Sequence, residues 1–218
     1  MFDYILFDLD GTVSDPKVGI CTSVQYGLSK MGIDVPDINV LTPFIGPPLR
    51  DSFRDFYHIS DADIEKVVAF YRERFSTVGL FENELYPGVE ELLSVLKERG
   101  KKLALASSKP RVFVIKILDY FGITKYFDVV MGSELDGTRE NKVEIIEESL
   151  RLLFEGETPD LEKCVMVGDR KYDVEAAAKV GLKGIGVTYG YGSREELVNA
   201  GADIICDSVE ELKNLLLS

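Results

Sequence analysis

The chain has 218 residues, of which 38 are acidic and 25 are basic, so its formal net charge is −13. This length allows one large domain, or a main domain with a smaller insert, and it excludes a disulfide-stapled miniprotein. The acidic balance gives no general reason to bind duplex nucleic acid or an anionic membrane. No apolar run reaches 18 residues, which excludes a transmembrane helix, and the acidic N-terminal sequence MFDYILFDLDG is not expected to be a signal peptide.

The cysteines and the histidine indicate the cellular compartment to expect and the kinds of catalytic and metal site to exclude. Cys21, Cys164 and Cys206 lie far apart and form no CxxC pair, which favours free thiols in a reducing cytosol. His58 is the only histidine, and it stands in a polar stretch. We therefore expect a cytoplasmic protein without a His-based metal site and without a Ser-His-Asp triad.

The first part of the chain predicts one strand followed by helices. Residues 4–7 form a short apolar run typical of a buried strand. Residues 16–82 contain no good strand. They contain amphipathic patterns over 18–31 and 64–78, with a loop at 44–50 that leads into a helix. This segment is predicted to be a helical insert.

From about residue 83 to the C-terminus, apolar strand patterns alternate with helical patterns. Further strands are predicted at 102–106, 127–131, 164–167, 184–187 and 203–206, and helices at 89–96, 143–153 and 173–180. Such alternation is typical of a doubly wound parallel sheet. The prediction is an α/β fold with a Rossmann-like core, residues 1–15 and 83–218, and an inserted α-helical domain, residues 16–82.

Polar residues follow several of the predicted strands, at the sheet edge where ligands collect in such folds. They are Asp8, Asp10, Gly11 and Thr12 after the first strand, Ser107, Ser108 and Lys109 after the second, and Asp169 and Asp173 after the fourth. Asn141 and Lys142 open the helix that follows the third strand. The expected result is a cluster of carboxylates with a small hydroxyl and one or two lysines.

Asp8 and Asp10 are two positions apart, so an extended chain points both to the same side. Two close carboxylates resist joint ionisation unless a cation or a raised pKa relieves them. An all-oxygen site suits a hard divalent ion such as Mg²⁺. One carboxylate can then attack phosphorus as a nucleophile, while the other acts as general acid and base. Gly11 lets the backbone approach closely, and N–H groups of that turn can hold a phosphoryl oxygen.

Each of these features also has a structural explanation. The Asp-x-Asp-Gly sequence can be a metal-free turn, and Ser107 can be a helix N-cap. Lys142 can be a solvated surface lysine. Asp169 can be a capping residue, and Asp173 can be an acid in the first turn of a helix. Their joint occurrence in this order, each at the end of a strand, favours a functional site.

These motifs resemble those of the haloacid dehalogenase-like hydrolase superfamily, on its phosphatase branch. Residues 7–12, FDLDGT, match the first family motif, Ser107 the second, Lys142 the third, and Gly168 and Asp169 with Asp173 the fourth. The helical insert looks like the superfamily's first type of cap. Within the branch, the chain is most similar to phosphoglycolate phosphatase-like and bacterial 5′-nucleotidase-like proteins, and residues 45–50 resemble their cap substrate loop.

The resemblance implies a role for each matching residue. Asp8 is expected to be the nucleophile and a Mg²⁺ ligand. Asp10 is expected to be the acid and base and to offer its backbone carbonyl to the metal. Asp169 is the third protein ligand, and Asp173 orients the water shell of the metal or Lys142. Ser107 and Lys142 hold the transferring phosphoryl group, and the further substrate-binding residues are Gly11, Thr12, Ser108, Lys109 and Arg50.

The expected function is Mg²⁺-dependent hydrolysis of a small phosphorylated metabolite, phosphoglycolate or a 5′-nucleotide, by a monomer or homodimer with a mobile cap. One alternative is phosphoryl transfer like that of β-phosphoglucomutase. Two others, from a different class, are a receiver-like signalling domain and a catalytically silent binding protein. The two aspartates argue against a dehalogenase, which lacks the second of them.

Overall fold

The computed structural model describes residues 1–136 and 138–218, and the contacts among them divide the chain into two compact units. One unit comprises Met1–Asp15 and Leu85–Ser218, and the other comprises Pro16–Glu84. Two short strands, β2 (Ser14–Asp15) and β3 (Glu84–Leu85), pair where the chain passes between units. We call the first the α/β unit and the second the helical unit.

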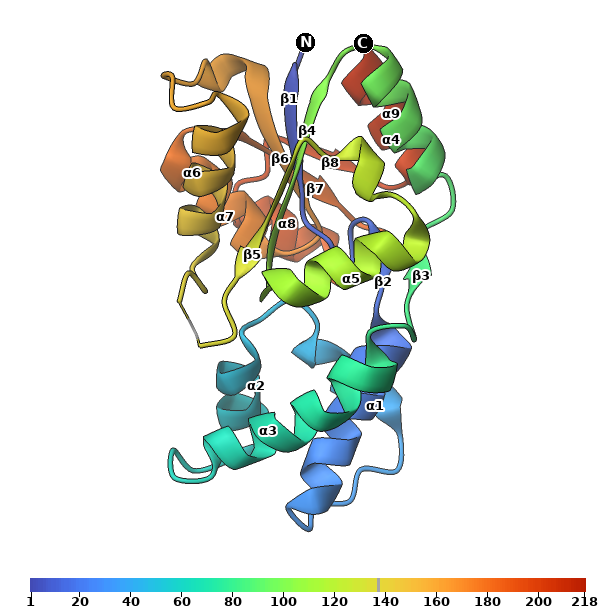
Figure 1. Cartoon of the computed structure of the whole chain (residues 1–218), viewed down its shortest axis with the longest axis vertical. Coiled ribbons are helices and arrows are strands. Elements are labelled where there is room, and N and C mark those ends of the chain that lie inside the picture. Colours follow the sequence, from blue (N-terminus) through green and yellow to red (C-terminus); the bar gives the residue numbers. More distant parts are fainter. Residues whose placement is uncertain (137) are drawn as a thin grey trace. The chain divides into compact units, whose positions relative to one another are not determined.

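The α/β unit is built on a six-stranded sheet in the order β5-β4-β1-β6-β7-β8, and every pair of neighbouring strands is parallel (Figure 1). Its strands are β1 (Tyr4–Phe7), β4 (Lys102–Pro110), β5 (Val129–Ser133), β6 (Cys164–Gly168), β7 (Lys183–Val187) and β8 (Ile204–Cys206). The predicted α/β class is therefore confirmed. Strand β1 lies between β4 and β6, so the chain order reverses at the centre of the sheet.

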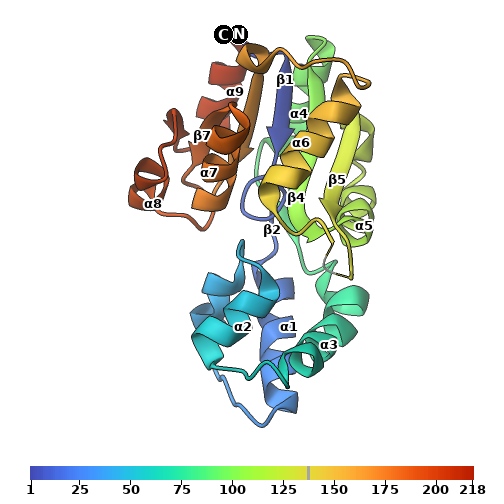
Figure 2. The same cartoon turned by 90° about the vertical axis from the view of Figure 1, so that its left-hand side faces the viewer.

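Helices cover both faces of this sheet (Figure 2). They are α4 (Val89–Glu98), α5 (Arg111–Phe121), α6 (Lys142–Leu153), α7 (Lys171–Val180), α8 (Arg194–Asn199) and α9 (Val209–Leu217), with short 3₁₀ turns η3 (Thr124–Tyr126) and η4 (Leu161–Lys163). Leu6 and Met166 from the strands pack with Ile146 of α6 and Ala177 of α7 in one apolar core. Burial on both faces explains why the strands are continuously apolar.

Strand β4 is longer than predicted. It continues past Ala106 to Pro110, with a shift in its register against β5 between these two residues. Ser107 and Lys109 therefore belong to the end of the strand, whereas the sequence predicts them directly after it. Pro110 pairs with Ser133 of β5, and the register shift lies between this pair and the pair of Ala106 with Met131.

The helical unit contains α1 (Lys17–Lys30), the 3₁₀ turn η1 (Ile38–Phe44), α2 (Leu49–Tyr57), α3 (Ile64–Arg74) and the π-helical turn η2 (Phe75–Gly79). Helix α1 packs on α3, η1 and η2. A Cβ atom at Gly19 would lie 2.0 Å from the carbonyl oxygen of Gly79, so only glycine allows this close approach of α1 and η2.

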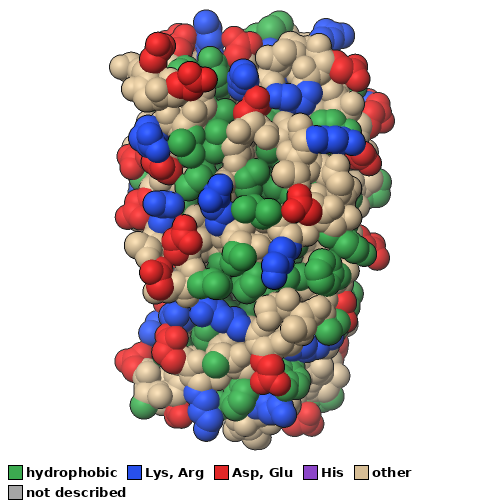
Figure 3. All heavy atoms as spheres, in the orientation of Figure 1, with side chains coloured by type: hydrophobic (Ala, Val, Ile, Leu, Met, Phe, Trp, Pro, Cys, Tyr) green, Lys and Arg blue, Asp and Glu red, His purple; other side chains and the backbone are tan. Residues whose placement is uncertain are grey.

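Within the described residues, no helix combines the length and the apolarity needed to cross a membrane. On the face displayed in Figure 3, basic, acidic and apolar side chains are interspersed. Charge is thus mixed over this face, as is usual for a protein surface.

Candidate active site

The candidate active site lies at the carboxyl ends of the three central strands. Asp8 directly follows β1, Asp169 directly follows β6, and Ser107 lies in the last part of β4. Lys142 and Asp173 come from the first turns of α6 and α7. Because β4, β1 and β6 are neighbours, these residues gather at the edge where the sequence predicts a site.

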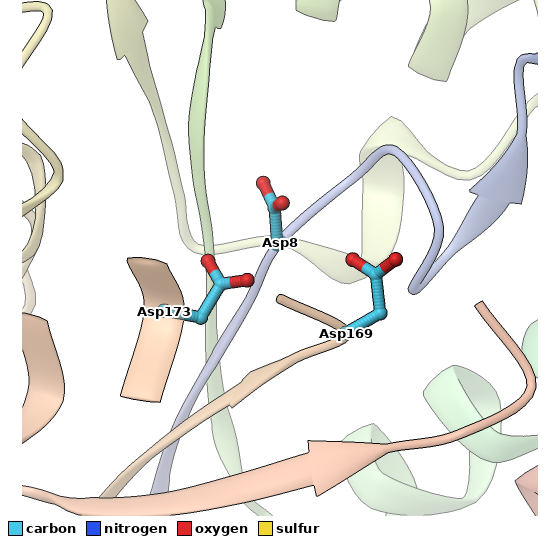
Figure 4. Close-up of side chains that lie close together, drawn as sticks. All are labelled: Asp8, Asp169 and Asp173. Atoms are coloured by element: carbon cyan, nitrogen blue, oxygen red, sulfur yellow. The ribbon is translucent and has the colours of Figure 1, made fainter. Parts of the chain in front are cut away.

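Three buried carboxylates form the centre of this cluster. One oxygen each from Asp8, Asp169 and Asp173 lies within 4.8 Å of the others. Figure 4 shows the three side chains pointing to the same side from the end of β1, the end of β6 and α7. The carboxylate of Asp10 is not a member of this group. Its predicted contribution to a metal site, through the backbone carbonyl, stays a prediction.

The ammonium group of Lys142 contacts two carboxylates of the cluster. Its Nζ lies 2.9 Å from Oδ1 of Asp8 and 2.8 Å from Oδ1 of Asp173, and it donates a hydrogen bond to the carbonyl oxygen of Ala106. The side chain is 7% exposed, so the reading of Lys142 as a solvated surface lysine is wrong. Burial alone lowers its pKa, but the charges of Asp173 and Asp8 outweigh burial and leave the pKa raised. Lys142 is therefore a buried cation at neutral pH.

Asp10 has a separate partner. Its Oδ1 accepts a hydrogen bond from Nζ of Lys109 at 2.7 Å, and both side chains are buried in this contact. Burial raises the pKa of Asp10, and the charge of Asp8 adds to this, although the Lys109 ammonium opposes the shift. In this structure Lys109 holds Asp10, and its predicted contact with substrate stays a prediction.

The serines of β4 are placed by the end of the strand. Ser107 is 2% exposed, and its Oγ accepts a hydrogen bond from the backbone N–H of Lys109. The carbonyl oxygen of Ser108 accepts from Oγ of Ser133. Helix α5 begins at Arg111 with Pro110 at its N-cap position, so the reading of Ser107 as a helix N-cap is wrong. The predicted substrate contacts of both serines stay predictions.

The turn after β1 is packed against Asp169. Gly11 has a φ of +81°, and a Cβ atom there would lie 2.1 Å from Oδ2 of Asp169, so glycine is required. The N–H groups of Gly11 and Thr12 already donate to the carbonyl oxygens of Ser14 and Leu9. Holding a phosphoryl oxygen with these groups, as predicted, would require them to exchange these hydrogen bonds. The close approach to Asp169 is the role of Gly11 that this structure shows.

Asp169 and Asp173 lie at the start of helix α7, and Asp173 also stabilises this end of the helix. Asp173 accepts a hydrogen bond from the backbone N–H of Arg170, which is the N-cap residue of α7. Asp173 therefore caps the helix as well as facing the cluster, and Asp169 lies just outside the helix. Burial raises the pKa of Asp173 to about 6 and that of Asp169 well above its usual value. The charge of Asp8 adds to both shifts.

The donor set fits a hard divalent cation. Four buried carboxylates and two buried ammonium groups leave a formal charge of 2 − 4 = −2 when all are ionised. Oδ1 of Asp8 and of Asp173 receive no hydrogen bond of regular geometry, although Lys142 lies in ion-pair range of both. A divalent ion would balance the charge with the oxygen ligands it prefers. Asp8, Asp169 and Asp173 are the residues that could hold it.

Arg50 belongs to the helical unit. It lies in the first turn of α2, and its guanidinium contacts the carboxylate of Glu65 on α3 through Nε at 2.7 Å and Nη2 at 3.2 Å. This contact joins two helices of that unit. The predicted contact of Arg50 with substrate stays a prediction.

One part of the site, the segment of residues 189–192, is not among the residues predicted from the sequence. The backbone N–H of Tyr191 donates to Oδ2 of Asp169 at 2.7 Å. The hydroxyl of Tyr189 donates to the carbonyl oxygen of Thr12 at 3.0 Å. The available signal was the sequence Tyr-Gly-Tyr-Gly one residue after β7, because alternating glycines at a strand end indicate a close approach of the backbone.

Comparisons with known proteins agree with this geometry. The family model described as haloacid dehalogenase-like hydrolase matches residues 5–187. A 5′-nucleotidase of Pseudomonas aeruginosa is 44% identical over 214 residues, which cover 98% of this chain and 95% of the relative. The tyrosine-protein kinase PtkA of Mycobacterium tuberculosis is 34% identical, with 97% and 72% covered, and a phosphoglycolate phosphatase of Vibrio parahaemolyticus is 31% identical, with 95% and 93% covered.

A solved structure gives the same result for the fold. The crystal structure of a predicted phosphatase from Clostridium acetobutylicum superposes with a TM-score of 0.94 at 44% identity, and the match covers 100% of this chain and 99% of that one. The family match spans the strands and helices that carry the acidic cluster. The chain therefore belongs to the haloacid dehalogenase-like hydrolase family.

Proposed function

We propose that this protein is a Mg²⁺-dependent phosphomonoesterase that forms an aspartyl-phosphate on Asp8. The observation that carries the proposal is the buried triad of Asp8, Asp169 and Asp173 with the ammonium of Lys142 between two of its members. A site of this composition binds a divalent cation and a phosphoryl group at the same place, because each offsets the charge that the other leaves.

The residues divide the reaction into two steps. An oxygen of Asp8 attacks phosphorus, and the bond from phosphorus to the leaving oxygen breaks. Asp10 gives its proton to that oxygen, which agrees with the raised pKa that burial gives this carboxyl group. Asp10 then takes a proton from the water that hydrolyses the aspartyl-phosphate. Lys142 and Ser107 bind the phosphoryl oxygens, and the cation supplies further neutralisation of charge when bound.

We further propose that the helical unit acts as a cap that excludes water and selects the substrate. A 5′-nucleotide is the first substrate candidate, because the relative at 44% identity is named for that activity. Phosphoglycolate is the second, since a relative at 31% identity is a phosphoglycolate phosphatase. The three cysteines are buried and form no disulfide with one another, which supports a reducing, cytoplasmic location.

Phosphate release from a panel of phosphomonoesters tests the proposal. The panel contains 5′-nucleotides, phosphoglycolate, phosphotyrosine and β-glucose 1-phosphate, each with Mg²⁺ and with EDTA. We expect release that requires Mg²⁺ and is lost in Asp8→Asn. Asp119→Asn, at an exposed carboxylate of α5, is the matched control and should retain activity. Full activity of Asp8→Asn would refute the role of Asp8 as the nucleophile. Isomerisation of β-glucose 1-phosphate without net release of phosphate would support a mutase instead.

A further inference from the structure

The segment that follows β7 is packed onto the acidic triad through its backbone. The N–H of Tyr191 donates to Oδ2 of Asp169 at 2.7 Å. A Cβ atom at Gly190 would lie 2.2 Å from the carbonyl oxygen of Gly11 and 2.5 Å from Cβ of Asp169. A Cβ atom at Gly192 would lie 1.9 Å from the carbonyl oxygen of Asp169. The segment therefore touches Asp169 on several sides, and side chains are absent where it does so.

The two tyrosine side chains of this segment reach the turn after β1. The hydroxyl of Tyr189 donates to the carbonyl oxygen of Thr12 at 3.0 Å, and its ring packs edge-on against Tyr86. The hydroxyl of Tyr191 donates to the carboxylate of Asp15, the last residue of the α/β unit before the chain enters the helical unit. The two hydroxyl contacts join residues that are more than 170 positions apart in the chain.

We propose that Tyr191 is a positioning residue for metal binding, with Tyr189 in a supporting role. The Tyr191 N–H fixes the orientation of the Asp169 carboxylate, and the hydroxyl of the same residue anchors the segment to Asp15. Loss of the hydroxyl removes the anchor but keeps the N–H, so Asp169 remains present and is held less firmly. Partners that orient metal ligands typically contribute about 10- to 100-fold to metal affinity.

This inference rests on the proposed function, because it requires Asp169 to be a metal ligand. The variant Tyr191→Phe tests the inference separately from that function, because it leaves every carboxylate of the triad intact. We expect this variant to bind Mg²⁺ about tenfold more weakly, at the lower end of the range for such partners. We also expect it to need more Mg²⁺ for activity and to recover most of its kcat when Mg²⁺ saturates.

Isothermal titration calorimetry with MgCl₂ on the metal-free full chain measures this affinity directly. Tyr126→Phe is the matched control, because its hydroxyl also contacts a carboxylate, that of Glu90, from a turn that precedes β5 at the other end of the sheet. The control should bind Mg²⁺ like the wild type. Equal affinity of wild type and Tyr191→Phe would overturn the inference and leave the proposed function standing. A wild type that binds no Mg²⁺ would overturn both.

The contact with Asp15 is tested by a double-mutant cycle. If the hydroxyl acts through Asp15, the double variant with Tyr191→Phe and Asp15→Ala should bind Mg²⁺ no more weakly than the weaker single variant. Losses that simply multiply would refute the anchor at Asp15. The melting temperature of each metal-free variant is measured in parallel, because a merely structural role would lower it without changing the Mg²⁺ affinity of the folded protein.

Discussion

Replacement of Lys142 by methionine tests the charge balance of the site. Methionine replaces the aliphatic part of the lysine side chain but lacks the ammonium that lies 2.9 Å from Asp8 and 2.8 Å from Asp173. Removal of one partner from a buried ion pair typically costs about 3–5 kcal/mol, because the other charge stays buried without compensation. For a chain of this size, each kcal/mol lowers the melting temperature by about 2–4 °C. We therefore expect a decrease of about 6–20 °C in metal-free protein.

The loss should depend on pH with a defined sign. The raised pKa of Lys142 keeps the ammonium charged across pH 5–8, so the titration of Lys142 itself adds no pH dependence in this range. Asp173, whose pKa burial raises to about 6, is largely protonated at pH 5 and ionised at pH 8. A protonated carboxyl group needs no ammonium partner. The difference in melting temperature between wild type and Lys142→Met should therefore grow from pH 5 to pH 8.

Thermal unfolding followed by circular dichroism, with steady-state phosphate release, measures both effects. The control is Lys179→Met, at an exposed position in the last turn of α7, which should change the melting temperature little. Activity of Lys142→Met should fall by about 100-fold or more, since a preorganised charge facing the transferring group is lost. A melting temperature and a kcat/KM equal to those of the wild type would refute the reasoning.

Three further predictions concern the metal site, the partner of Asp10 and the packing of the helical unit. Mg²⁺ at 100 times its dissociation constant should stabilise the protein by about 2.7 kcal/mol, measured by urea unfolding; no stabilisation would contradict a metal site. Lys109→Gln should lower kcat about tenfold or more with less effect on KM, because Asp10 loses the ammonium at 2.7 Å; an unchanged kcat would show that Asp10 needs no such partner. Gly19→Ala should destabilise the protein by about 1–3 kcal/mol in urea unfolding, because the new Cβ would collide with the carbonyl of Gly79. Val18→Ala, at the neighbouring exposed position, should not destabilise it, and equal effects of the two variants would refute this prediction.

The sequence by itself determined the fold class and the edge of the sheet that carries the site. The apolar runs at β1 and β6 predict strands because local patterning reports burial directly. The helical patterns predicted at residues 89–96 and 173–180 lie within α4 and α7. Asp8 and Asp169 were identified because each directly follows such a strand. The strand ends were less accurate, since the extension of β4 to Pro110 depends on pairing with β5 and not on its own polar sequence.

Only the tertiary structure decided which side chains contact each other. Lys109 and Asp10 are 99 positions apart, and no local pattern could show that the ammonium holds that carboxylate. The burial of Lys142 follows from the packing of α6 on the sheet, because its first turn is brought over the end of β1. Tyr191 reaches Asp15 across 176 positions. Sequence periodicity reports the environment of each residue, whereas partners distant in the chain are set by how the elements pack together.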